Sequence, residues 1–324
     1  MVEVDKLNSQ HAAQTPASSA GPLVECVPNF SEGADPSAVR AIVRSMQVEG
    51  VSLLDWSHDD DHHRSVVTLA GPPQAVLEAA VRGVGKAAEL IDLTRQQGAH
   101  PRIGAADVLP FVPMRGITLP ETVLLAHRAG QEIWKRHRIP VYFYEAAATR
   151  PDRTLLENVR RGQFEGLRRE SVSNPARKPD VGGPSLHPTA GACAVGARQL
   201  LIACNVYLDT GDVAVARAVA REVRASSGGL VGVKALGLSV DGRAQVSMNI
   251  THFRVTPVSR VYTAVAQAAL HAGAKPEEVE LIGLIPQDAL EPGSEWMRLV
   301  RGLPLQERTI ERKLETPLAW PEQN

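Results

Sequence analysis

The run Leu200-Leu201-Ile202-Ala203-Cys204-Asn205-Val206 repeats the character of Leu23-Val24-Glu25-Cys26-Val27 near the start of the chain. Each run reads as a strand and is followed by apolar residues at helical spacing: Val39, Ile42, Val43 and Met46 after the first, and Val213, Ala216, Val219, Ala220 and Val223 after the second. Two more strand patterns, a second helix pattern and a closing strand complete each half. This order is that of a ferredoxin-like βαββαβ unit. We therefore predict an α+β fold, a tandem duplication of two such subdomains, with a ligand cleft between them.

The pattern also predicts where the parts of the chain begin and end. Residues 1–20 are rich in Ala, Ser and Gln and are expected to form a disordered tail. An N-terminal subdomain is expected over 21–199 and a C-terminal subdomain over 200–290. Residues 150–182, which are Arg-rich and poor in apolar side chains, are expected to be a solvated connection with a short helix. Residues 291–324 read as a peripheral segment, to which we assign no role.

Composition excludes several classes of protein. The 324 residues contain 35 Lys and Arg against 36 Asp and Glu, which lacks the basic surplus of a nucleic-acid-binding protein. No apolar run approaches the roughly 20 residues needed to cross a bilayer, and the N-terminus has no signal-peptide pattern. The three cysteines have no metal-like spacing and lie in apolar surroundings. We expect a soluble cytoplasmic protein without disulfides.

The loop Gln97 to Asp107 contains the strongest candidate for proton transfer. Pro101 favours an extended conformation for His100, and Gly98 and Gly104 permit tight turns or close approach on either side. Histidine is the side chain best suited to move protons near neutral pH. Asp107 is placed to orient this imidazole, or alternatively to act as a strand-end carboxylate.

A second cluster of titratable groups occupies Ser57 to Arg64. Three carboxylates and three imidazoles lie there within seven positions, a set able to bind a divalent metal. One hypothesis is accordingly a metal-dependent hydrolase using Asp59, Asp61, His62 and His63. The same loop is also compatible with a solvated acidic turn or a substrate-facing loop.

The segment Gly183 to Gly191 is punctuated by Gly and Pro, and is able to bring backbone N–H groups close to a ligand or to act as a plain linker. No G-x-x-x-x-G-K-S/T sequence is present, and no dinucleotide-binding glycine pattern follows the first strand. These absences argue against nucleoside triphosphate and dinucleotide cofactors.

Many segments, taken together and in order, resemble the glutamate formimidoyltransferase family of histidine degradation. The segments that carry the resemblance span about 23 to 290: Leu-Val-Glu-Cys-Val-Pro-Asn-Phe-Ser-Glu-Gly at 23–33, Arg64-Ser65-Val66, His-Pro-Arg-Ile-Gly-Ala at 100–105, Asp107-Val108, Pro-Val-Tyr at 140–142, Pro179-Asp180, Gly183-Pro184-Ser185, Gly196-Ala197-Arg198, Asn205-Val206, Gln245-Val246-Ser247-Met248-Asn249 and Gly283-Leu284-Ile285-Pro286.

The resemblance implies a fold of two ferredoxin-like subdomains with a folate tunnel between them. It implies transfer of a formimino group from N-formimino-L-glutamate to N5 of tetrahydrofolate, with tetrahydrofolate as co-substrate and without a metal. The catalytic residue of the family falls on His100, with Asp107 as its candidate orienting partner. The folate-binding loop falls on the segment that contains Gly183, Pro184, Ser185 and Gly191.

Other roles follow from charge and from position in the family's motifs. Arg64 and Arg102 are the candidates for binding glutamate carboxylates, and His63 and Asn249 are further candidates for substrate contact. Family members carry Asn where this chain has His63, a departure that also raises the possibility of a non-catalytic folate-binding homologue. The family further implies a homodimer and a separate cyclodeaminase, because this chain has no room for that domain.

Overall fold

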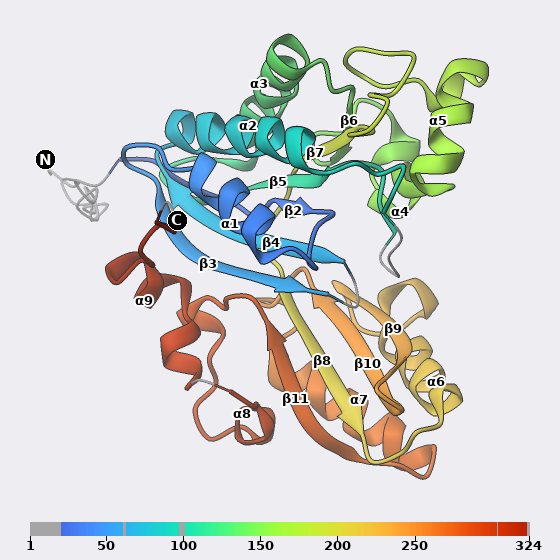
Figure 1. The fold of residues 1–324 in the computed structure, drawn as a ribbon. Coiled ribbons are helices and arrows are strands. Elements are labelled where there is room, and N and C mark those ends of the chain that lie inside the picture. Colours follow the sequence, from blue (N-terminus) through green and yellow to red (C-terminus); the bar gives the residue numbers. More distant parts are fainter. Residues whose placement is uncertain (1–20, 61–62, 97–100, 303, 323–324) are drawn as a thin grey trace, which may run out of the picture.

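The computed structural model describes residues 21–60, 63–96, 101–302 and 304–322. The predicted disordered tail, residues 1–20, lies outside this range. The described chain forms two lobes, each with one β-sheet and helices on one side of it (Figure 1). The first lobe contains strands β1 to β7, and the second contains β8 to β11. The predicted α+β class is thereby confirmed, with two separate sheets.

The sheet of the first lobe runs in the spatial order β3, β4, β1 with β2, β5, β7, β6. The bounds of its strands are β1 (Leu23–Cys26), β2 (Asn29–Phe30), β3 (Ser52–Asp59), β4 (Arg64–Gly71), β5 (Ala106–Arg115), β6 (Val141–Glu145) and β7 (Cys193–Ala197). Strands β1 and β2 both pair with β4 and β5, so they act as one strand interrupted at Val27 and Pro28. Pro28 has no N–H to donate, which explains the interruption.

Two details of this sheet differ from the sequence analysis. Asn29 and Phe30 read as a turn-rich loop but form β2. Residues Cys193–Ala197 were given no strand, yet β7 lies parallel between β5 and β6. Its sequence, CAVGA, has a single β-branched residue, Val195, and otherwise small side chains, which give little strand signal. All five residues are buried, so the strand is stabilised by the elements that cover it.

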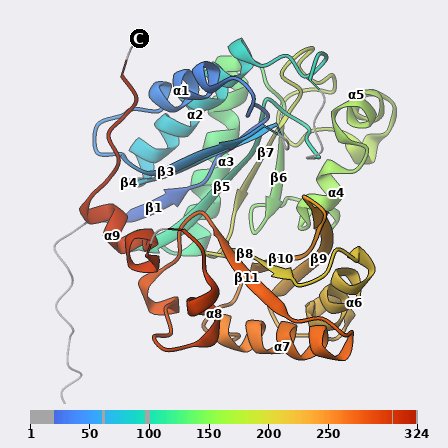
Figure 2. The ribbon, with the colours of Figure 1, turned by 60° about the horizontal axis from the view of Figure 1, so that its bottom comes forward.

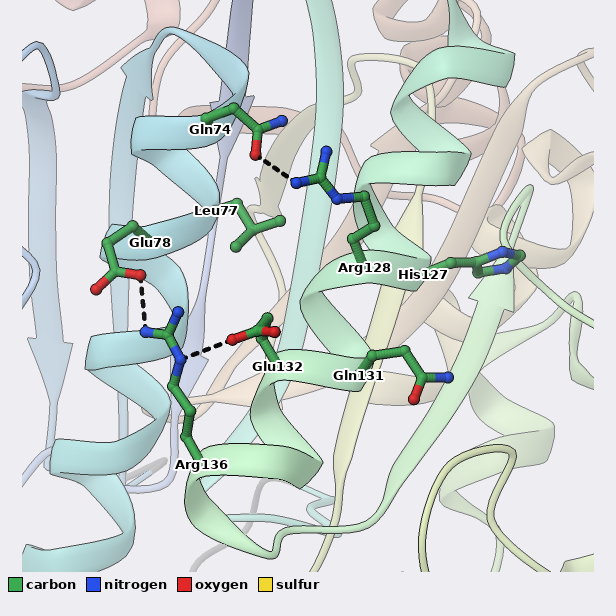
Figure 3. A pocket seen from close by; sticks show the side chains of 8 residues that line it. All are labelled: Gln74, Leu77, Glu78, His127, Arg128, Gln131, Glu132 and Arg136. Atoms are coloured by element: carbon green, nitrogen blue, oxygen red, sulfur yellow. Dashed lines mark hydrogen bonds and ion pairs between the residues drawn. The ribbon is translucent and has the colours of Figure 1, made fainter.

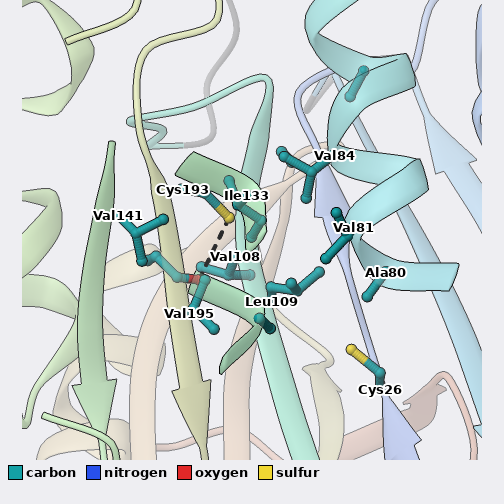
Figure 4. Packing of buried hydrophobic residues seen from close by; sticks show 14 of the residues in the cluster. Cys26, Ala80, Val81, Val84, Val108, Leu109, Ile133, Val141, Cys193 and Val195 are labelled. Carbon is teal, nitrogen blue, oxygen red and sulfur yellow. Dashed lines mark hydrogen bonds between the residues drawn. The ribbon is translucent and has the colours of Figure 1, made fainter. Parts of the chain in front are cut away.

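Three helices cover one face of this sheet: α1 (Pro36–Ser45), α2 (Pro73–Leu90) and α3 (Leu119–His137). Their starts follow local capping rules, because Asp35 accepts hydrogen bonds from Ser37 N and Ala38 N, and Thr118 with Glu121 forms a capping box. Apolar side chains from the helices interdigitate with those of the strands, among them Val81, Val84, Ile133, Leu109 and Cys193 (Figure 4).

The Arg-rich connection is more ordered than the sequence predicts. It forms a 3-10 turn at Pro151–Arg153, α4 (Leu156–Arg160), α5 (Gln163–Ser173) and another 3-10 turn at Pro175–Arg177. Arg153 and Arg177 are buried, and they pair with Asp180 at 2.6 Å and Glu170 at 2.9 Å. The expectation of a solvated connection is wrong for these side chains, because the two carboxylates and several backbone carbonyls of the same segment satisfy them.

The second lobe is an antiparallel sheet in the order β11, β8, β10, β9. Its elements are β8 (Ile202–Leu208), α6 (Val213–Val223), a 3-10 turn at Ala225–Ser227, β9 (Val233–Val240), β10 (Arg243–Ile250), α7 (Val258–His271) and β11 (Pro276–Ile282). The predicted hairpin at Asp241-Gly242 is confirmed, and both residues have positive φ. Helices α6 and α7 cover the face of this sheet that points away from the first lobe (Figure 2).

The two sheets lie between the two helical layers and face one another (Figure 2). At one end Leu54 and Ala70 of the first sheet pack with Ile310 of α9 (Ile310–Glu315). At the other end Lys234 of β9 lies 3.6 Å from Glu145 and 3.7 Å from Glu157. The two lobes therefore contact each other at both ends of the facing sheets.

The C-terminal segment contacts both lobes. It contains 3-10 turns at Gln287–Ala289 and Leu305–Arg308, and helices α8 (Glu295–Leu299) and α9. Trp296 is buried in the second core, whereas Leu318 N donates to the carbonyl of Leu53 on β3 at 2.8 Å. Among the described helices, none is long and apolar enough to cross a membrane.

Candidate functional site

Two glycines bring the segment after the His100 loop against the segment that ends the Gly183 loop. A Cβ on Gly104 would lie 2.0 Å from the carbonyl oxygen of Ala192, and one on Gly191 would lie 2.1 Å from that of Ile103. The two backbones exchange hydrogen bonds, Ala105 N to Ala190 O and Ala192 N to Ile103 O, both at 2.9 Å. We call this contact the glycine seam. It holds the chain rigidly on the C-terminal side of residue 100.

The four residues named in the predicted folate loop differ in their exposure to solvent. Gly183, Pro184 and Ser185 are exposed, and the Gly183–Pro184 peptide bond is cis. Gly191 is buried in the glycine seam. Of the four residues, therefore, the first three are accessible to a ligand and the last has a structural role.

The loop after β2 joins the same region. The hydroxyl of Ser31 donates to Gly104 O at 2.7 Å, and Ser31 N donates to Ala105 O at 2.9 Å. Gly33 lies against the β3–β4 hairpin, since a Cβ there would be 2.0 Å from Asp59 O. The loop after β2 thus contacts the glycine seam through Ser31 and the β3–β4 hairpin through Gly33.

The described histidines of the acidic hairpin are engaged with this loop. His58 Nδ1 lies 2.9 Å from Gly33 O, and His63 Nδ1 accepts from Gly33 N at 3.4 Å and lies 3.5 Å from Glu32. Asp61 and His62 lie outside the described residues. Within the described part of the chain, no three His, Cys, Asp or Glu side chains are grouped as a metal site requires. Asp59 and His63, the two described residues of the hydrolase hypothesis, belong to no such group.

Arg102 is buried, and its Nη2 donates within the protein, whereas its Nε has no hydrogen-bond partner among the described residues. Its Nη2 donates to Gln96 O at 2.8 Å and to Glu165 Oε1 at 3.0 Å, while its own carbonyl accepts from Phe164 N at 2.8 Å. The side chain therefore ties α5 to the chain on the N-terminal side of the His100 loop. His100 itself, the predicted catalytic residue, lies outside the described residues.

Asp107 lies at a bulge in β5. Asn29 pairs with Val108 and Phe30 with Ala106, so the pairing skips Asp107. Such bulges redirect side chains and are common beside functional sites. Asp107 is 2% exposed; Oδ1 accepts from Ile103 N at 2.8 Å, and Oδ2 forms an ion pair with Arg160.

Arg64 belongs to the same electrostatic cluster. Burial lowers the pKa of Arg64, the charge of Arg160 lowers it further, and Asp107 and Asp59 oppose both effects. The sequence analysis gave Arg160 no individual role, because nothing local links it to Asp107. Arg64 therefore lies within electrostatic reach of Asp107, whereas Arg102 has a different set of partners.

Asn249 lies on the second lobe. It is exposed and pairs across the strands with Lys234 of β9 and Ala203 of β8. Cross-strand neighbours share a face, so Asn249 lies beside Lys234, which contacts Glu157 on α4. This places Asn249 on the inward side of its sheet, near the helix that carries Arg160.

One buried carboxyl group was missed by the sequence analysis. Glu25 is buried on β1, and burial raises its pKa to about 7, against an opposing effect of Arg198. Cys26, the next residue, points into the helical core (Figure 4). Strand alternation therefore directs Glu25 to the face turned toward the second lobe.

A separate depression of about 460 Å³ lies between α2 and α3 (Figure 3). Its lining residues pair among themselves, for example Arg136 with Glu78 at 2.7 Å and with Glu132 at 2.8 Å. It lies on the helical side of the first sheet, away from the cluster of Asp107, Arg160 and Arg64. We assign it no catalytic role.

Comparison with known proteins agrees with the division into two lobes. Residues 23–198 match the formiminotransferase domain, N-terminal subdomain, and residues 203–308 match the formiminotransferase domain. The chain is 41% identical to glutamate formimidoyltransferase of Streptococcus pyogenes, covering 90% of this chain and 98% of that protein. It is 40% identical to the enzyme of the same name from Thermoplasma acidophilum, over 90% of this chain and 97% of that protein.

A third relative is bifunctional. The formimidoyltransferase-cyclodeaminase of Gallus gallus is 38% identical over 85% of this chain, which spans 52% of that protein. The fold and the comparisons define an α+β protein with the two parts of a formiminotransferase domain. The chain belongs to the formiminotransferase family.

Proposed function

We propose that this protein is a glutamate formimidoyltransferase, which transfers the formimino group of N-formimino-L-glutamate to N5 of tetrahydrofolate. The observation that carries the proposal is the 41% identity to an enzyme of that name over nearly the full length of both chains. The products are 5-formiminotetrahydrofolate and L-glutamate. Tetrahydrofolate is a co-substrate that is consumed and not a resident cofactor.

The chemistry requires proton transfer between two nitrogen atoms. N5 attacks the amidine carbon to give a tetrahedral intermediate, whose collapse breaks the bond to the glutamate nitrogen. N5 loses a proton in this sequence and the leaving nitrogen gains one. A single imidazole suits both steps, and we assign them to His100. Arg102 and the glycine seam anchor the described residues that flank 97–100, Gln96 on one side and Ile103 to Ala105 on the other.

Substrates are proposed to bind between the facing sheets. The inward position of Asn249, the cluster of Arg64 and Arg160, and the exposed Gly183 to Ser185 segment support this location. Holding two bulky reactants together supplies much of the acceleration in such a reaction. Part of the first sheet, in the order β3, β4, β1 with β2, and β5, corresponds to the order β9, β10, β8 and β11 of the second sheet. This correspondence supports an origin from two ferredoxin-like units. We also retain the predicted cytoplasmic location, homodimer and separate cyclodeaminase as hypotheses.

A spectrophotometric assay tests the proposal directly. Wild-type protein should form 5-formiminotetrahydrofolate from tetrahydrofolate and N-formimino-L-glutamate. His100→Ala should lower kcat by about 10²- to 10⁴-fold while it retains folate binding and the wild-type melting temperature. His271→Ala, at the exposed end of α7, serves as the control and should retain full activity. Full turnover by His100→Ala would remove the assigned mechanism, and turnover only with a formyl donor would reassign the substrate.

A further inference from the structure

We propose that the two lobes pivot about one edge of the facing sheets, and that Lys234 closes the opposite edge, through which substrates enter and leave. We call the contact of Lys234 with Glu145 and Glu157 the gate. What passes through the gate rests on the proposed function, whereas the motion of the lobes does not depend on it.

The lobes contact each other along opposite edges of the two sheets. The edge strands are β3 and β6 in the first sheet, and β11 and β9 in the second. Leu54 of β3 shares an apolar cluster with Ile310 of α9 and with Leu284, which follows β11. We call this contact the hinge. Lys234 of β9 instead reaches Glu145, the last residue of β6. Helix α9 accordingly lies at one side of the molecule, and α4 with β9 at the other (Figure 2).

The hinge is held by the chain itself as well as by apolar packing. Leu200, in the link between β7 and β8, packs against the same cluster. Ile310 N donates to Ile285 O of the second lobe at 3.0 Å, and Leu318 N donates to Leu53 O of the first lobe at 2.8 Å. Buried apolar contacts and backbone hydrogen bonds are little affected by salt. This edge can therefore turn but cannot separate.

The gate is a much weaker contact. Lys234 Nζ lies 3.6 Å from Glu145 Oε1 and 3.7 Å from Glu157 Oε1, both beyond hydrogen-bond distance. The side chains of Lys234, Glu145 and Glu157 are 42%, 33% and 66% exposed. Ion pairs between exposed side chains contribute little to stability, and salt screens them further. The gate can therefore open while the hinge stays closed.

The backbone of Glu145 departs from its strand to form the gate. Phe143, two residues earlier on β6, contacts the ring of His127 on α3, so strand alternation would direct Glu145 to the helical side as well. Glu145 instead has a φ of +52°, a conformation that residues with a Cβ rarely adopt. Strained residues of this kind concentrate at functional positions. The strain thus occurs at the residue of β6 that meets the second lobe.

The gate adjoins the residues that the proposed function places between the sheets. Glu157 shares the short helix α4 with Arg160, which forms an ion pair with Asp107. Lys234 pairs across the strands with Asn249, on the inward face of the second sheet. Opening this edge would expose both sides of the proposed substrate site at once. A folate is too large to reach facing sheets without such an opening.

Distances between spin labels in the full chain test the motion. Labels at Arg161→Cys and Ser239→Cys, both exposed, span the gate, and the native cysteines are buried. Lys234→Glu places three carboxylates together and should at least double the population at longer distance. Adding Glu145→Lys and Glu157→Lys restores opposite charges and should restore the wild-type distribution. Identical distributions in all three proteins would overturn the proposal.

A second label pair and salt serve as controls. Glu49→Cys precedes β3 and Arg298→Cys lies on α8, which contacts β11, so this pair spans the hinge and should keep its distance in every variant. Sodium chloride at about 1 M should lengthen the gate distance in wild type but not in Lys234→Met, which has no charge to screen. Equal lengthening of both label pairs would exclude a hinge.

A reversible cross-link tests whether substrates pass the gate. Lys234→Cys with Glu157→Cys, joined by a bis-methanethiosulfonate linker, should lower turnover at least about tenfold, and reduction should restore it, because a closed edge blocks exchange. The same linker between Arg169→Cys and Ser173→Cys, both exposed on α5, stays within one lobe and should leave turnover unchanged.

The two measurements separate this inference from the proposed function. If the wild-type protein does not turn over N-formimino-L-glutamate, the enzymatic assignment fails, but the label distances still decide whether the gate opens. If the cross-linked gate variant retains full turnover, substrates do not pass Lys234 and the gating role is excluded, although the enzymatic assignment stands.

Discussion

Gly191 lies against the carbonyl oxygen of Ile103, so closely that a Cβ at Gly191 would be 2.1 Å from that oxygen. Gly191 also has a φ of +68°. Gly191→Ala should therefore cost both the strain of a left-handed residue and the separation of two hydrogen-bonded backbones. We expect a loss of about 3 kcal/mol or more in the free energy of unfolding, measured by urea denaturation.

Gly273→Ala is the matched control for this substitution. Gly273 has a φ of +78°, but a Cβ there would have no atom within 4 Å among the described residues. Its cost should be only the backbone strain, about 1 kcal/mol. If the two variants lost the same free energy of unfolding, the close contact at Gly191 would not be the reason for glycine at that position.

A substitution of Arg102 tests whether this residue stabilises the fold or binds substrate. Because its Nη2 donates to Gln96 O and Glu165, we expect Arg102→Gln to lower the free energy of unfolding by about 2 kcal/mol without any ligand present. Arg95→Gln, whose side chain is 87% exposed, is the control and should be close to neutral. If Arg102→Gln instead keeps wild-type stability and raises only the donor KM, the sequence-based assignment to substrate binding is right.

Glu25 should make stability depend on pH. Its pKa is about 7 in the folded protein against a reference of 4.5, so the folded state holds an extra proton between these values. The resulting penalty is absent below about pH 4.5, grows as the pH rises, and is complete above about pH 7, where it is worth about 3 kcal/mol.

Glu25→Gln should therefore be more stable than wild type at pH 8 and similar to it at pH 5, as measured by urea denaturation at both values. Glu49→Gln, at an exposed position after α1, should show no such difference. A Glu25→Gln variant that loses the same stability at both pH values would indicate that the carboxylate is ionised and useful in the fold.

Ile310 tests the contact between the C-terminal segment and the first sheet. It is 1% exposed and packs with Leu54 and Ala70. Ile310→Ala should lower the free energy of unfolding by about 2 to 4 kcal/mol, because it removes buried methyl groups and leaves a cavity. Leu270→Ala, at a 71% exposed position, should change stability by less than about 0.5 kcal/mol. Equal effects would mean that α9 is only loosely attached.

The local sequence determined the order of strands and helices in both halves. Helix starts at Asp35 and Thr118 and the hairpin at Asp241-Gly242 follow from interactions within a few residues, which a sequence displays directly. The motifs between about 23 and 290 were sufficient to indicate the family. Strand β7 was not predicted, because its mostly small residues form a strand only where the rest of the fold buries them.

Only the tertiary structure decided which side chains meet. Asp107 and Arg160 are 53 residues apart in sequence, and their ion pair depends on a bulge in β5 and on the packing of α4. The partners of Arg102 and the close contact at Gly191 likewise come from distant segments. Sequence periodicity reports which face of an element is buried, but the burial and pairing of a charged group depend on what the rest of the chain places beside it.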